Sequence, residues 1–421
     1  MRMLGNVSTT IYDCIVIGAG ASGLFYAAAE DTSSAGPKNS SGRKLILEKT
    51  SRPGQKLLLS GSGACNITHG GSIKDFIGHY GDNGSKIRSC LYKHSNLQLM
   101  KFMEDAGVPL TEREDGKVFP ASMKAQDVLD GLLAKASRNG FELLCKYEVT
   151  GISQDADVIT VTAEAGHAEA EVFQTRKLVI ATGGASYPAT GSDGSFMDVL
   201  ARDLDLHITQ LKPALAPVYV ENYPYSELSG ISFPDVEVTC RSNTLRGPML
   251  LTHKGFSGPV MLHISQYVQP GALLTINYLP DQSIADVYRK VKSDQPGNSK
   301  GIANYLSREF GLPKAFTQAM FTAPGTGGRD AAARKLSSVG HKELENIVHL
   351  LMERRHTVSG TGGFREAMAT AGGVCLDEID MKNMSLIDHP NIHIIGEALD
   401  INGDTGGYNL QFAYASALAA R

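Results

Sequence analysis

The chain has 421 residues and a mass of 45.0 kDa. This exceeds the ~250–300 residues at which single hydrophobic cores stop growing, so we expect more than one domain. Its 42% hydrophobic and 20% charged residues exclude a disordered, collagen-like or coiled-coil chain. The formal net charge of −4 argues against a generally basic nucleic-acid-binding protein.

The N-terminal segment predicts a strand, a glycine turn, a helix and a second strand. Residues 11–17 are apolar and β-branched, residues 22–30 are rich in Ala, and residues 44–48 are apolar again. This βαβ order predicts a parallel sheet. The polar segment 31–43, between the helix and the second strand, is expected to be a surface loop.

The next predicted elements continue the same α/β pattern. Apolar residues recur at helical spacing from Ala125, and Asn139-Gly140 supplies a helix stop. Strands are predicted after this stop, at residues 141–147, 158–162 and 177–181.

The character of the chain changes beyond about residue 206. Short β-rich runs broken by Pro and Gly, up to residue 279, predict a small antiparallel barrel or sandwich. Residues 281–352 then have a helical pattern. Strands and glycine turns return from Gly372, and an Ala-rich helix is expected at residues 410–420.

The sharpest local motif is the GxGxxG run at residues 18–23, placed between the first strand and the first helix. Glycines at this spacing make a tight turn, allow close approach of a pyrophosphate and let the helix pack on the strand. The helix N-terminus attracts the phosphates. Glu48, at the end of the second strand, is the expected acceptor for a ribose hydroxyl. The alternative is an ordinary glycine turn with a surface Glu.

Two further glycine turns follow predicted strands. One is Ala181-Thr182-Gly183-Gly184, and the other begins at Gly396 and leads into the last helix through Gly406-Gly407. Carboxyl ends of parallel strands lie at one edge of a sheet, so these turns are expected to converge in a crevice. No second GxGxxG follows a strand to hold a separate nicotinamide cofactor.

Motifs along nearly the whole chain together support a resemblance. They are GAGASG at 18–23, LEK at 47–49, GQKLLLSGSGACNITH at 54–69, EDGKVFPAS at 114–122, ATGGASYPATGSDG at 181–194, PALAPV at 213–218, LTHKGFSGPVML at 251–262, ATAGGV at 369–374 and GEALDINGDTGGYNLQFA at 396–413. They resemble the FAD-dependent oxidoreductases of the BaiN/YhiN type, within the two-dinucleotide-binding-domain flavoprotein superfamily. One departure is Ala64, where many relatives have Arg.

The resemblance implies an α/β fold in which a Rossmann-like FAD-binding domain is interrupted by a small β-barrel domain carrying a helical insert. The order of elements read from the sequence agrees with this plan. The expected domains are the FAD-binding domain at 1–203 and 357–421, the barrel at 204–280 and 341–356, and the helical insert at 281–340.

The motifs and the resemblance together assign cofactor-binding residues. They are Gly18, Gly20, Ala21, Ser22, Gly23, Glu48, Lys49, Lys56, Ser60, Gly61, Cys65, Asn66, Val149, Ala181, Thr182, Gly183, Gly396, Glu397, Asp400, Gly407, Tyr408, Asn409 and Leu410. Asn66 is expected at the flavin edge, Asp400 at a ribityl hydroxyl, and the backbone of Val149 at the adenine. The start of the last helix, at 407–410, is expected to stabilise negative charge on the reduced flavin.

Catalytic candidates are fewer. His253 and Lys254 lie in a predicted turn and are expected to reach the substrate, although a turn stabilised by a histidine hydrogen bond is the alternative. Cys65 is a candidate redox thiol or a small packed residue beside the flavin. Arg365 and Glu366 are weaker candidates. The remaining histidines and the six cysteines show no metal-ligand spacing, so no metal site is expected and the thiols are expected to be reduced.

The expected function is that of an FAD-dependent oxidoreductase, more specifically a reductase of an activated C=C bond. The resemblance implies different substrates in different branches: bile acids, aminoacetone in an oxidase, and uridine of large-subunit ribosomal RNA in a dihydrouridine synthase. A flavin-binding redox sensor is the non-enzymatic alternative. NAD(P)H is expected at most as a transient electron donor.

The expected partner is a small-molecule substrate, with RNA as the alternative. Residues 281–356 contain twelve Lys or Arg and eight Asp or Glu, a net charge of +4. Basic residues cluster there on predicted helices: Arg289, Lys290, Lys292, Arg334, Lys335, Arg354 and Arg355. Ordinary solvated helix faces explain the same pattern. No signal peptide or long apolar run is present, so a cytoplasmic protein without a membrane partner is expected, with its oligomeric state open.

Overall fold

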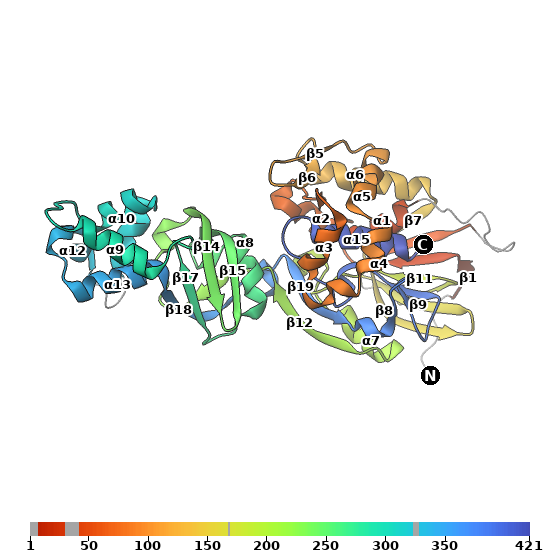
Figure 1. Ribbon diagram of the computed structural model, residues 1–421. Helices are drawn as coiled ribbons and strands as arrows, with labels where there is room; N and C mark the ends of the chain where they lie inside the picture. Colours follow the sequence, from red (N-terminus) through yellow and green to blue (C-terminus); the bar gives the residue numbers. More distant parts are fainter. Residues whose placement is uncertain (1–6, 30–41, 167–168, 323–327) are drawn as a thin grey trace. The chain divides into compact units, whose positions relative to one another are not determined.

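The computed structural model describes residues 7–29, 42–166, 169–322 and 328–421 (Figure 1). Most of the predicted surface loop 31–43 lies outside these ranges. The chain divides into two compact units, one made of Met1–Pro213 with Ala367–Arg421 and the other of Ala214–Glu366. A unit formed by two distant segments agrees with the expected α/β domain interrupted by an insertion.

The first unit is built on a seven-stranded sheet. Its strands, in spatial order, are β20 (Ile379–Asp380), β21 (Ser385–Leu386), β22 (Ile392–Ile394), β11 (Leu178–Ile180), β2 (Cys14–Ile17), β3 (Lys44–Glu48) and β7 (Phe141–Cys145). The five strands from β22 to β7 run parallel. Their carboxyl ends therefore share one edge of the sheet, and the predicted glycine turns all follow strands of this group.

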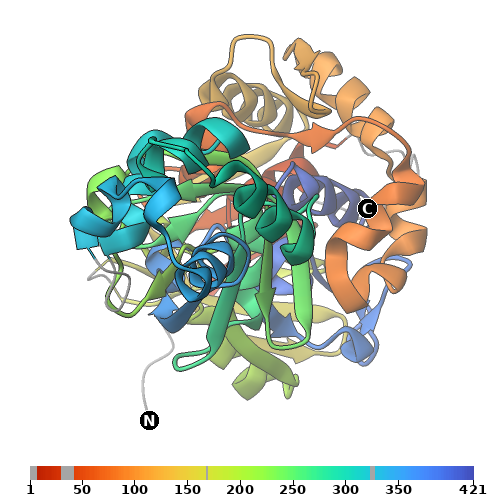
Figure 2. The same ribbon diagram turned by 60° about the vertical axis from the view of Figure 1, so that its left-hand side comes forward.

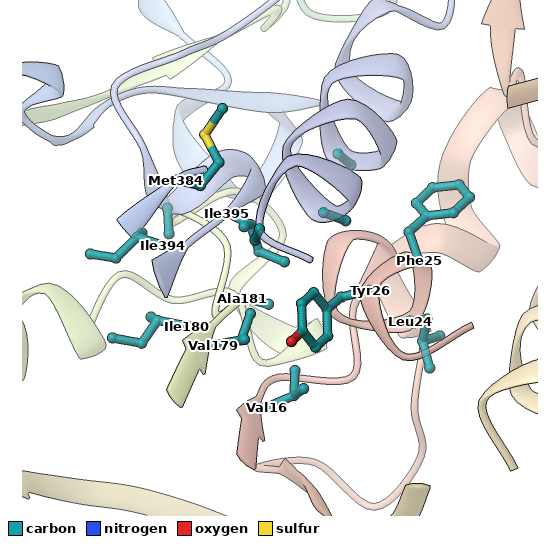
Figure 3. Close-up of a cluster of buried hydrophobic side chains, with 14 of the residues drawn as sticks. Val16, Leu24, Phe25, Tyr26, Val179, Ile180, Ala181, Met384, Ile394 and Ile395 are labelled. Atoms are coloured by element: carbon teal, nitrogen blue, oxygen red, sulfur yellow. The ribbon is translucent and has the colours of Figure 1, made fainter. Parts of the chain in front are cut away.

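The sheet packs against helices through strands that are buried on both faces, as parallel strands usually are. Val16, Ile180 and Ile394 each have no exposed surface. Figure 3 shows that Tyr26 of α1 (Ala21–Ala28) points toward the strands, beside Val16 and Val179, whereas Leu24 and Phe25 lie on the other side of this helix. Two longer helices, α6 (Ala125–Arg138) and α15 (Tyr408–Ala419), pack against α1 and complete this core.

Asn139 links the ends of two helices. It caps α6, as its Asn-Gly pair predicts, and its side-chain amide donates to the carbonyl oxygens of Ala27 at 2.9 Å and Ala29 at 2.8 Å. These are carbonyls that the end of α1 leaves without an intrahelical partner. One polar side chain thus stops the second helix and fixes the end of the first.

Smaller sheets surround this core. The four-stranded sheet contains β1 (Val7–Tyr12), β10 (Glu171–Thr175), β9 (Val158–Ala165) and β8 (Tyr147–Asp155); the others are β4 (Thr68–His69) with β6 (Lys117–Pro120) and β5 (Leu110–Glu112), and β12 (Ile208–Ala214) with β19 (Ala369–Val374). The single strand predicted at 11–17 is two strands that enter different sheets. They break at Asp13, whose carboxylate binds Arg176 at 3.2 Å and accepts from the Gly42 N–H at 2.8 Å.

Shorter helices cover the first unit. They are α2 (Gln55–Leu59), α3 (Ile73–Phe76), η2 (Ile77–Ser85), α4 (Arg88–Lys93), α5 (Asn96–Asp105) and α7 (Phe196–Leu204). Ser95 begins α5 with a capping box, because its hydroxyl accepts from Gln98 N–H while the Gln98 side chain accepts from Ser95 N–H.

The second unit is a closed barrel with an attached group of helices. The barrel order is β13 (Val218–Val220), β16 (Phe256–Ser257), β15 (Asn243–Leu251), β14 (Ser232–Cys240), β17 (Leu273–Asn277) and β18 (Arg354–Thr361). The predicted barrel or sandwich is therefore a barrel. The helices are α8 (Pro259–Ile264), α9 (Ile284–Asp294), α10 (Ile302–Phe310), α11 (Lys314–Ala319), α12 (Gly328–Ala333) and α13 (His341–Met352).

Figure 1 shows α9, α10, α12 and α13 grouped at one end of the barrel strands, and Figure 2 presents this group toward the reader. Barrel and helices share one hydrophobic cluster. Two details differ from the sequence-based division of domains. Residues 341–352 form helix α13, packed on α9, and the predicted boundary at 356/357 falls inside β18.

Candidate cofactor site

The glycine turns after β2, β11 and β22 lie against one another. A Cβ atom on Gly18, which has φ +99°, would lie 2.5 Å from the carbonyl oxygen of Ala181. A Cβ atom on Gly396, with φ +66°, would lie 2.5 Å from Ser22 Oγ. The turns therefore meet at the start of α1, and they need glycine because neighbouring backbone fills the space of a side chain.

The glycines of the GxGxxG run have different surroundings. A Cβ atom on Gly23 would lie 2.0 Å from the Gly18 carbonyl oxygen, so this glycine lets α1 pack on its own turn. Gly20, at the start of α1, has no atom within 4 Å of such a Cβ position. The middle glycine therefore faces open space at a helix N-terminus, the place a pyrophosphate takes in this motif.

Glu48 ends β3 beside this turn and is 8% exposed. Its Oε2 accepts from the Ala19 N–H at 2.8 Å, and its Oε1 accepts from both the N–H and the hydroxyl of Thr50 at 2.8 and 2.6 Å. These bonds fix the carboxylate at the carboxyl end of the sheet. Each oxygen has a further lone pair, so the group retains capacity for a ribose hydroxyl.

The lysines predicted to meet the cofactor are held by carboxylates. Lys49 Nζ lies 2.8 Å from Glu148 and 2.7 Å from Asp193. Burial lowers the pKa of Lys49, but these two partners outweigh burial and raise it. Lys56 Nζ lies 2.6 Å from Glu397. Both side chains therefore have protein partners, which neutralise their charge.

Glu397 and Asp400 join the turn after β22 to β19. Glu397 accepts from the Thr370 N–H at 2.7 Å, and Asp400 accepts from the Gly372 N–H at 3.1 Å. Their carboxylates thus position backbone near the predicted cofactor. A ribityl contact of Asp400 remains a prediction.

The segment before β4 follows an unusual backbone path. Gly61, Ser62, Gly63 and Cys65 all have positive φ, and for Ser62 and Cys65 this is uncommon. The Cys65 thiol is fully buried. Burial raises its pKa to about 11, although a hydrogen bond with Ser60 lowers it. A protonated, enclosed thiol supports the packed residue over the redox thiol among the two sequence-based alternatives.

Asn66 anchors the start of α15. In the amide orientation that satisfies its neighbours, the Asn66 nitrogen donates to the carbonyl oxygens of Thr68 at 2.9 Å and Val118 at 3.1 Å, and its oxygen accepts from the Gly407 N–H at 3.1 Å. Asn409 fastens the preceding loop by accepting from the Gly403 N–H and donating to its carbonyl oxygen, both at 2.8 Å. The two amides hold this helix N-terminus in place.

Tyr408 lies between two histidines. Its ring stacks on His79 with centroids 4.0 Å apart and on His69 at 5.7 Å. His79 Nδ1 lies 3.0 Å from Asp404. Burial and then the charge of Asp404 raise the pKa of Tyr408 to about 12. Neither histidine could be assigned a role from the sequence, because the stack combines side chains that are far apart along the chain.

Thr182 supplies a direct test of whether the residues fit a cofactor. Its hydroxyl is buried and has no hydrogen-bond partner among the described residues. It lies in the turn that contacts Gly18, where a Cβ atom on Gly18 would lie 3.3 Å from Thr182 Cα. An unpartnered hydroxyl near the glycine turns fits a ligand rich in phosphate and hydroxyl groups, as FAD is.

The Val149 side chain is 6% exposed and packs in the core.

The catalytic candidates of the barrel lie on an exposed turn between β15 and β16. Thr252 closes this turn, because its hydroxyl donates to the Gly255 carbonyl oxygen at 2.9 Å. The side chains of His253 and Lys254 are exposed and do not close it. This removes the histidine-stabilised turn as an explanation of His253. Its role, and that of Lys254, remains a prediction.

The weaker candidates differ from each other. Glu366 accepts from the Tyr219 hydroxyl at 2.6 Å. Burial and this bond raise the pKa of Tyr219 to about 12. Arg365 is exposed.

Among the described residues, no group of His, Cys, Asp and Glu has the arrangement of a metal site. No helix in the described ranges is long and apolar enough to cross a membrane.

A parallel sheet with a GxGxxG turn, an acidic residue ending the next strand and two further turns at the same edge defines a Rossmann-type dinucleotide-binding protein. The chain belongs to the HI0933-like family, because the family description "HI0933-like protein Rossmann domain" matches residues 12–421. The predicted resemblance is thereby confirmed, and the chain is an FAD-dependent oxidoreductase.

Similar proteins extend over nearly the whole chain. The chain is 29% identical over 415 residues to "Ribosomal RNA dihydrouridine synthase" of Escherichia coli, covering 97% of this chain and 96% of that protein. It is 25% identical over 427 residues to "3-dehydro-bile acid delta(4,6)-reductase" of Clostridium scindens, covering 96% and 97%.

A solved 3-ketosteroid-delta4-(5alpha)-dehydrogenase from Rhodococcus jostii RHA1 has a similar fold, with a TM-score of 0.50, 15% identity and 98% of both chains covered. The open conformation of a flavocytochrome c3 fumarate reductase also has a TM-score of 0.50, with 13% identity and 98% and 78% covered. These likenesses concern the fold alone.

Proposed function

We propose that this protein reduces an activated C=C bond. The relatives named above carry the proposal. Forming dihydrouridine and reducing a delta(4,6) system in a 3-dehydro bile acid both saturate a C=C bond conjugated with a carbonyl group. The substrates differ in size and polarity, so the shared feature is the reaction. FAD, when bound, supplies hydride transfer at its flavin ring.

The chain contributes binding and electrostatics. Gly20 leaves the start of α1 open to a pyrophosphate, and Glu48, which already accepts from the Ala19 N–H, would accept a ribose hydroxyl as well. At α15 the first intrahelical bond is donated by Gln411 to Gly407, so the N–H groups of residues 408–410 precede it. These groups and the positive helix end stabilise negative charge at the flavin.

The electron donor follows from the same residues. The chain has one GxGxxG fingerprint, which FAD uses. NAD(P)H therefore binds only transiently, and we expect slow, weakly saturable flavin reduction by NADH and NADPH in stopped-flow experiments. Tight, saturable binding of either nucleotide contradicts this expectation.

Small-molecule substrates are favoured over RNA by the charges of the helical insert. Many basic side chains of the segment 281–356 pair with carboxylates: Arg289 with Asp286, Lys290 with Asp294 and Glu309, Arg334 with Glu343, and Arg355 with Glu353. Two members of the predicted basic clusters also lie elsewhere than expected. Arg354 and Arg355 are on strand β18, and Arg354 is 8% exposed.

A second candidate, reduction of uridine in ribosomal RNA, rests on the name of the Escherichia coli relative and on the lysines that remain. Lys335 pairs with Gly301 in a short β-bridge, Lys300 precedes Gly301, and neither lysine has an ion pair among the described residues. If RNA is the substrate, replacing both with Glu weakens RNA binding and flattens its salt dependence. Arg289→Glu is the matched control, since Asp286 already neutralises that side chain.

One set of experiments tests the reaction. Protein reduced with dithionite under anaerobic conditions should be reoxidised by a conjugated enone such as 2-cyclohexenone. Aminoacetone that reduces the oxidised flavin, while enones leave the reduced flavin unchanged, would indicate an amine oxidase. A flavin that dithionite reduces, but that exchanges electrons with neither an enone nor aminoacetone, would favour the flavin-binding redox sensor.

A deletion strain separates the two substrate classes. If ribosomal RNA from the strain keeps all its dihydrouridine by mass spectrometry, the RNA version is eliminated and the small-molecule reductase remains. Loss of dihydrouridine at a defined position, restored by the gene, would establish the RNA version.

A further inference from the structure

The end of the barrel next to the helices contains a buried group of polar side chains. Tyr225 is 0%, Tyr278 3%, His356 7% and Arg354 8% exposed. Arg354 and His356 alternate inward on β18 with the exposed Arg355 between them. Tyr278 follows β17, and Tyr225 follows β13. We call these four residues the barrel cluster.

Four polar atoms of the barrel cluster have no hydrogen-bond partner outside the cluster, and within it only Tyr225 interacts with the Tyr278 hydroxyl and with Arg354. This holds for the hydroxyls of Tyr225 and Tyr278, for Arg354 Nε and for His356 Nε2, and also for the hydroxyl of the adjacent Tyr223. Buried polar groups are nearly always hydrogen-bonded, so a concentration of exceptions in one place needs an explanation. In the rest of the described chain only His94 Nε2 and the Thr182 hydroxyl share this state.

Aromatic rings surround these atoms and offer them no acceptor. Phe256 lies 5.1 Å from His356 between ring centroids, and Phe316 lies 4.6 Å from Tyr278 and 5.4 Å from Tyr225. These walls come from the barrel and from α11, within one hydrophobic cluster. The site is therefore apolar around a polar centre.

Arg354 brings a full positive charge into this centre. No carboxylate of the described residues pairs with it, whereas its neighbour Arg355 reaches Glu353 at 3.9 Å. A guanidinium stays protonated in proteins, and burying it without a counter-charge is costly. Its effect on neighbours is visible: burial and then the charge of Arg354 lower the pKa of His356 to about 3. Burial raises the pKa of Tyr225 and of Tyr278, so neither phenol supplies the missing negative charge.

We propose that the barrel cluster binds a small monovalent anion, chloride in solution, inside the second unit. The cluster offers phenolic O–H groups and a guanidinium N–H, which are donors and suit an acceptor that carries negative charge. An ordered water molecule satisfies the hydroxyls but leaves the charge of Arg354 uncompensated. The anion therefore accounts for both the unpartnered donors and the unpaired cation.

Bromide replaces chloride in such sites and is located by its anomalous scattering. Crystals of the full-length protein grown in sodium bromide should show an anomalous peak within hydrogen-bond distance of Arg354 Nε. Density for water alone at this position, with bromide only on the surface, overturns the proposal. This readout uses the unmodified protein and does not depend on the folding of a variant.

Thermal unfolding measures the energetic consequence. The unfolding midpoint of the second unit should rise by about 2–4 °C when sodium gluconate is exchanged for sodium chloride at equal ionic strength, with saturation. Arg354→Met should lose this response. Arg355→Met, one residue away with a side chain 65% exposed, should keep it. An equal midpoint in both salts for the unmodified protein contradicts the proposal.

Discussion

The buried side chain of Gln411 in the first unit is fully hydrogen-bonded to other segments, whereas the barrel cluster of the second unit has no partner outside itself. Gln411 is fully buried beside α5 and β4, yet its amide oxygen accepts from the Thr68 hydroxyl at 2.8 Å and its nitrogen donates to the His94 carbonyl oxygen at 2.8 Å. Tyr278 and Arg354 are almost as buried, and they have no such bonds.

Buried polar groups that connect two segments of the chain have protein partners, whereas the barrel cluster is the proposed anion-binding site. Asn66, Glu397 and Gln411 each tie two segments of the first unit together, and these segments border the predicted cofactor site. The Thr182 hydroxyl has no partner, and it lies in the glycine turn after β11 that contacts Gly18. Nothing in the structure explains the unpartnered His94 Nε2.

The largest effect on stability is expected from a side chain placed in the GxGxxG turn of the first unit, where α1 packs on its own turn. Gly23→Val places its Cβ against the Gly18 carbonyl oxygen, 2.0 Å from the ideal position. We expect a loss of about 3 kcal/mol or more in the free energy of unfolding, measured by urea denaturation. Gly20→Ala is the control and should change this free energy by only about 0.5 kcal/mol, because open space surrounds it. Equal destabilisation by both changes contradicts the account.

A direct contrast of the two units uses one substitution in each. Gln411→Met leaves the Thr68 hydroxyl and a carbonyl without partners and should cost about 1–3 kcal/mol. Tyr278→Phe removes a hydroxyl that has no partner outside the barrel cluster, so in chloride-free gluconate buffer it should leave stability unchanged or slightly higher. A substantial cost for Tyr278→Phe in that buffer would show that the hydroxyl is bonded within the chain.

Acid should destabilise both units through buried histidines. Burial lowers the pKa of His356 to about 3 and those of His94 and His393 to about 4. As pH falls below about 6.5, the unfolded chain takes up these protons before the folded chain does, so stability is lost until the folded pKa is reached. The expected slope approaches about 1.4 kcal/mol per pH unit for each of the well-buried His356 and His393. It is smaller for His94, which is only half-buried and partly screened by solvent. In calorimetry, His356→Leu should remove its share from the second unit and leave the first unit unchanged.

The smallest expected change is in FAD affinity, from removing the unpartnered Thr182 hydroxyl of the first unit. Thr182→Val should leave the stability of the cofactor-free protein unchanged, because the hydroxyl has no partner to lose. The dissociation constant of FAD should rise about fivefold, the equivalent of one ordinary hydrogen bond of about 1 kcal/mol. Unchanged FAD affinity in fluorescence titration would remove Thr182 from the binding site.

Much of the fold follows from local patterns in the sequence. The strand predicted at 44–48 is β3, because β-branched and apolar residues between turn signals suffice there. The Asn-Gly stop after α6 is equally local. The glycine turns could be placed at one edge because parallel strands leave no other arrangement.

Long-range contacts account for what the sequence could not predict. The break at Asp13 depends on Arg176, and the histidine stack on Tyr408 combines His69 with His79. Arg354 and Arg355 were predicted as one basic helical surface, but a strand turns them to opposite faces. Two adjacent arginines do not show whether side chains alternate as in a strand or follow a helix, so the pairing of β18 with its neighbouring strands was needed to tell them apart.

The most direct test of the account is the FAD content of the unmodified protein and of Gly20→Val, compared by absorbance and by release with acid. The unmodified protein should carry about one non-covalent FAD per chain. Gly20→Val should keep native circular dichroism and lose the flavin, since its side chain fills the open space at the start of α1. A folded Gly20→Val variant that keeps its FAD would contradict the cofactor site described by this structure.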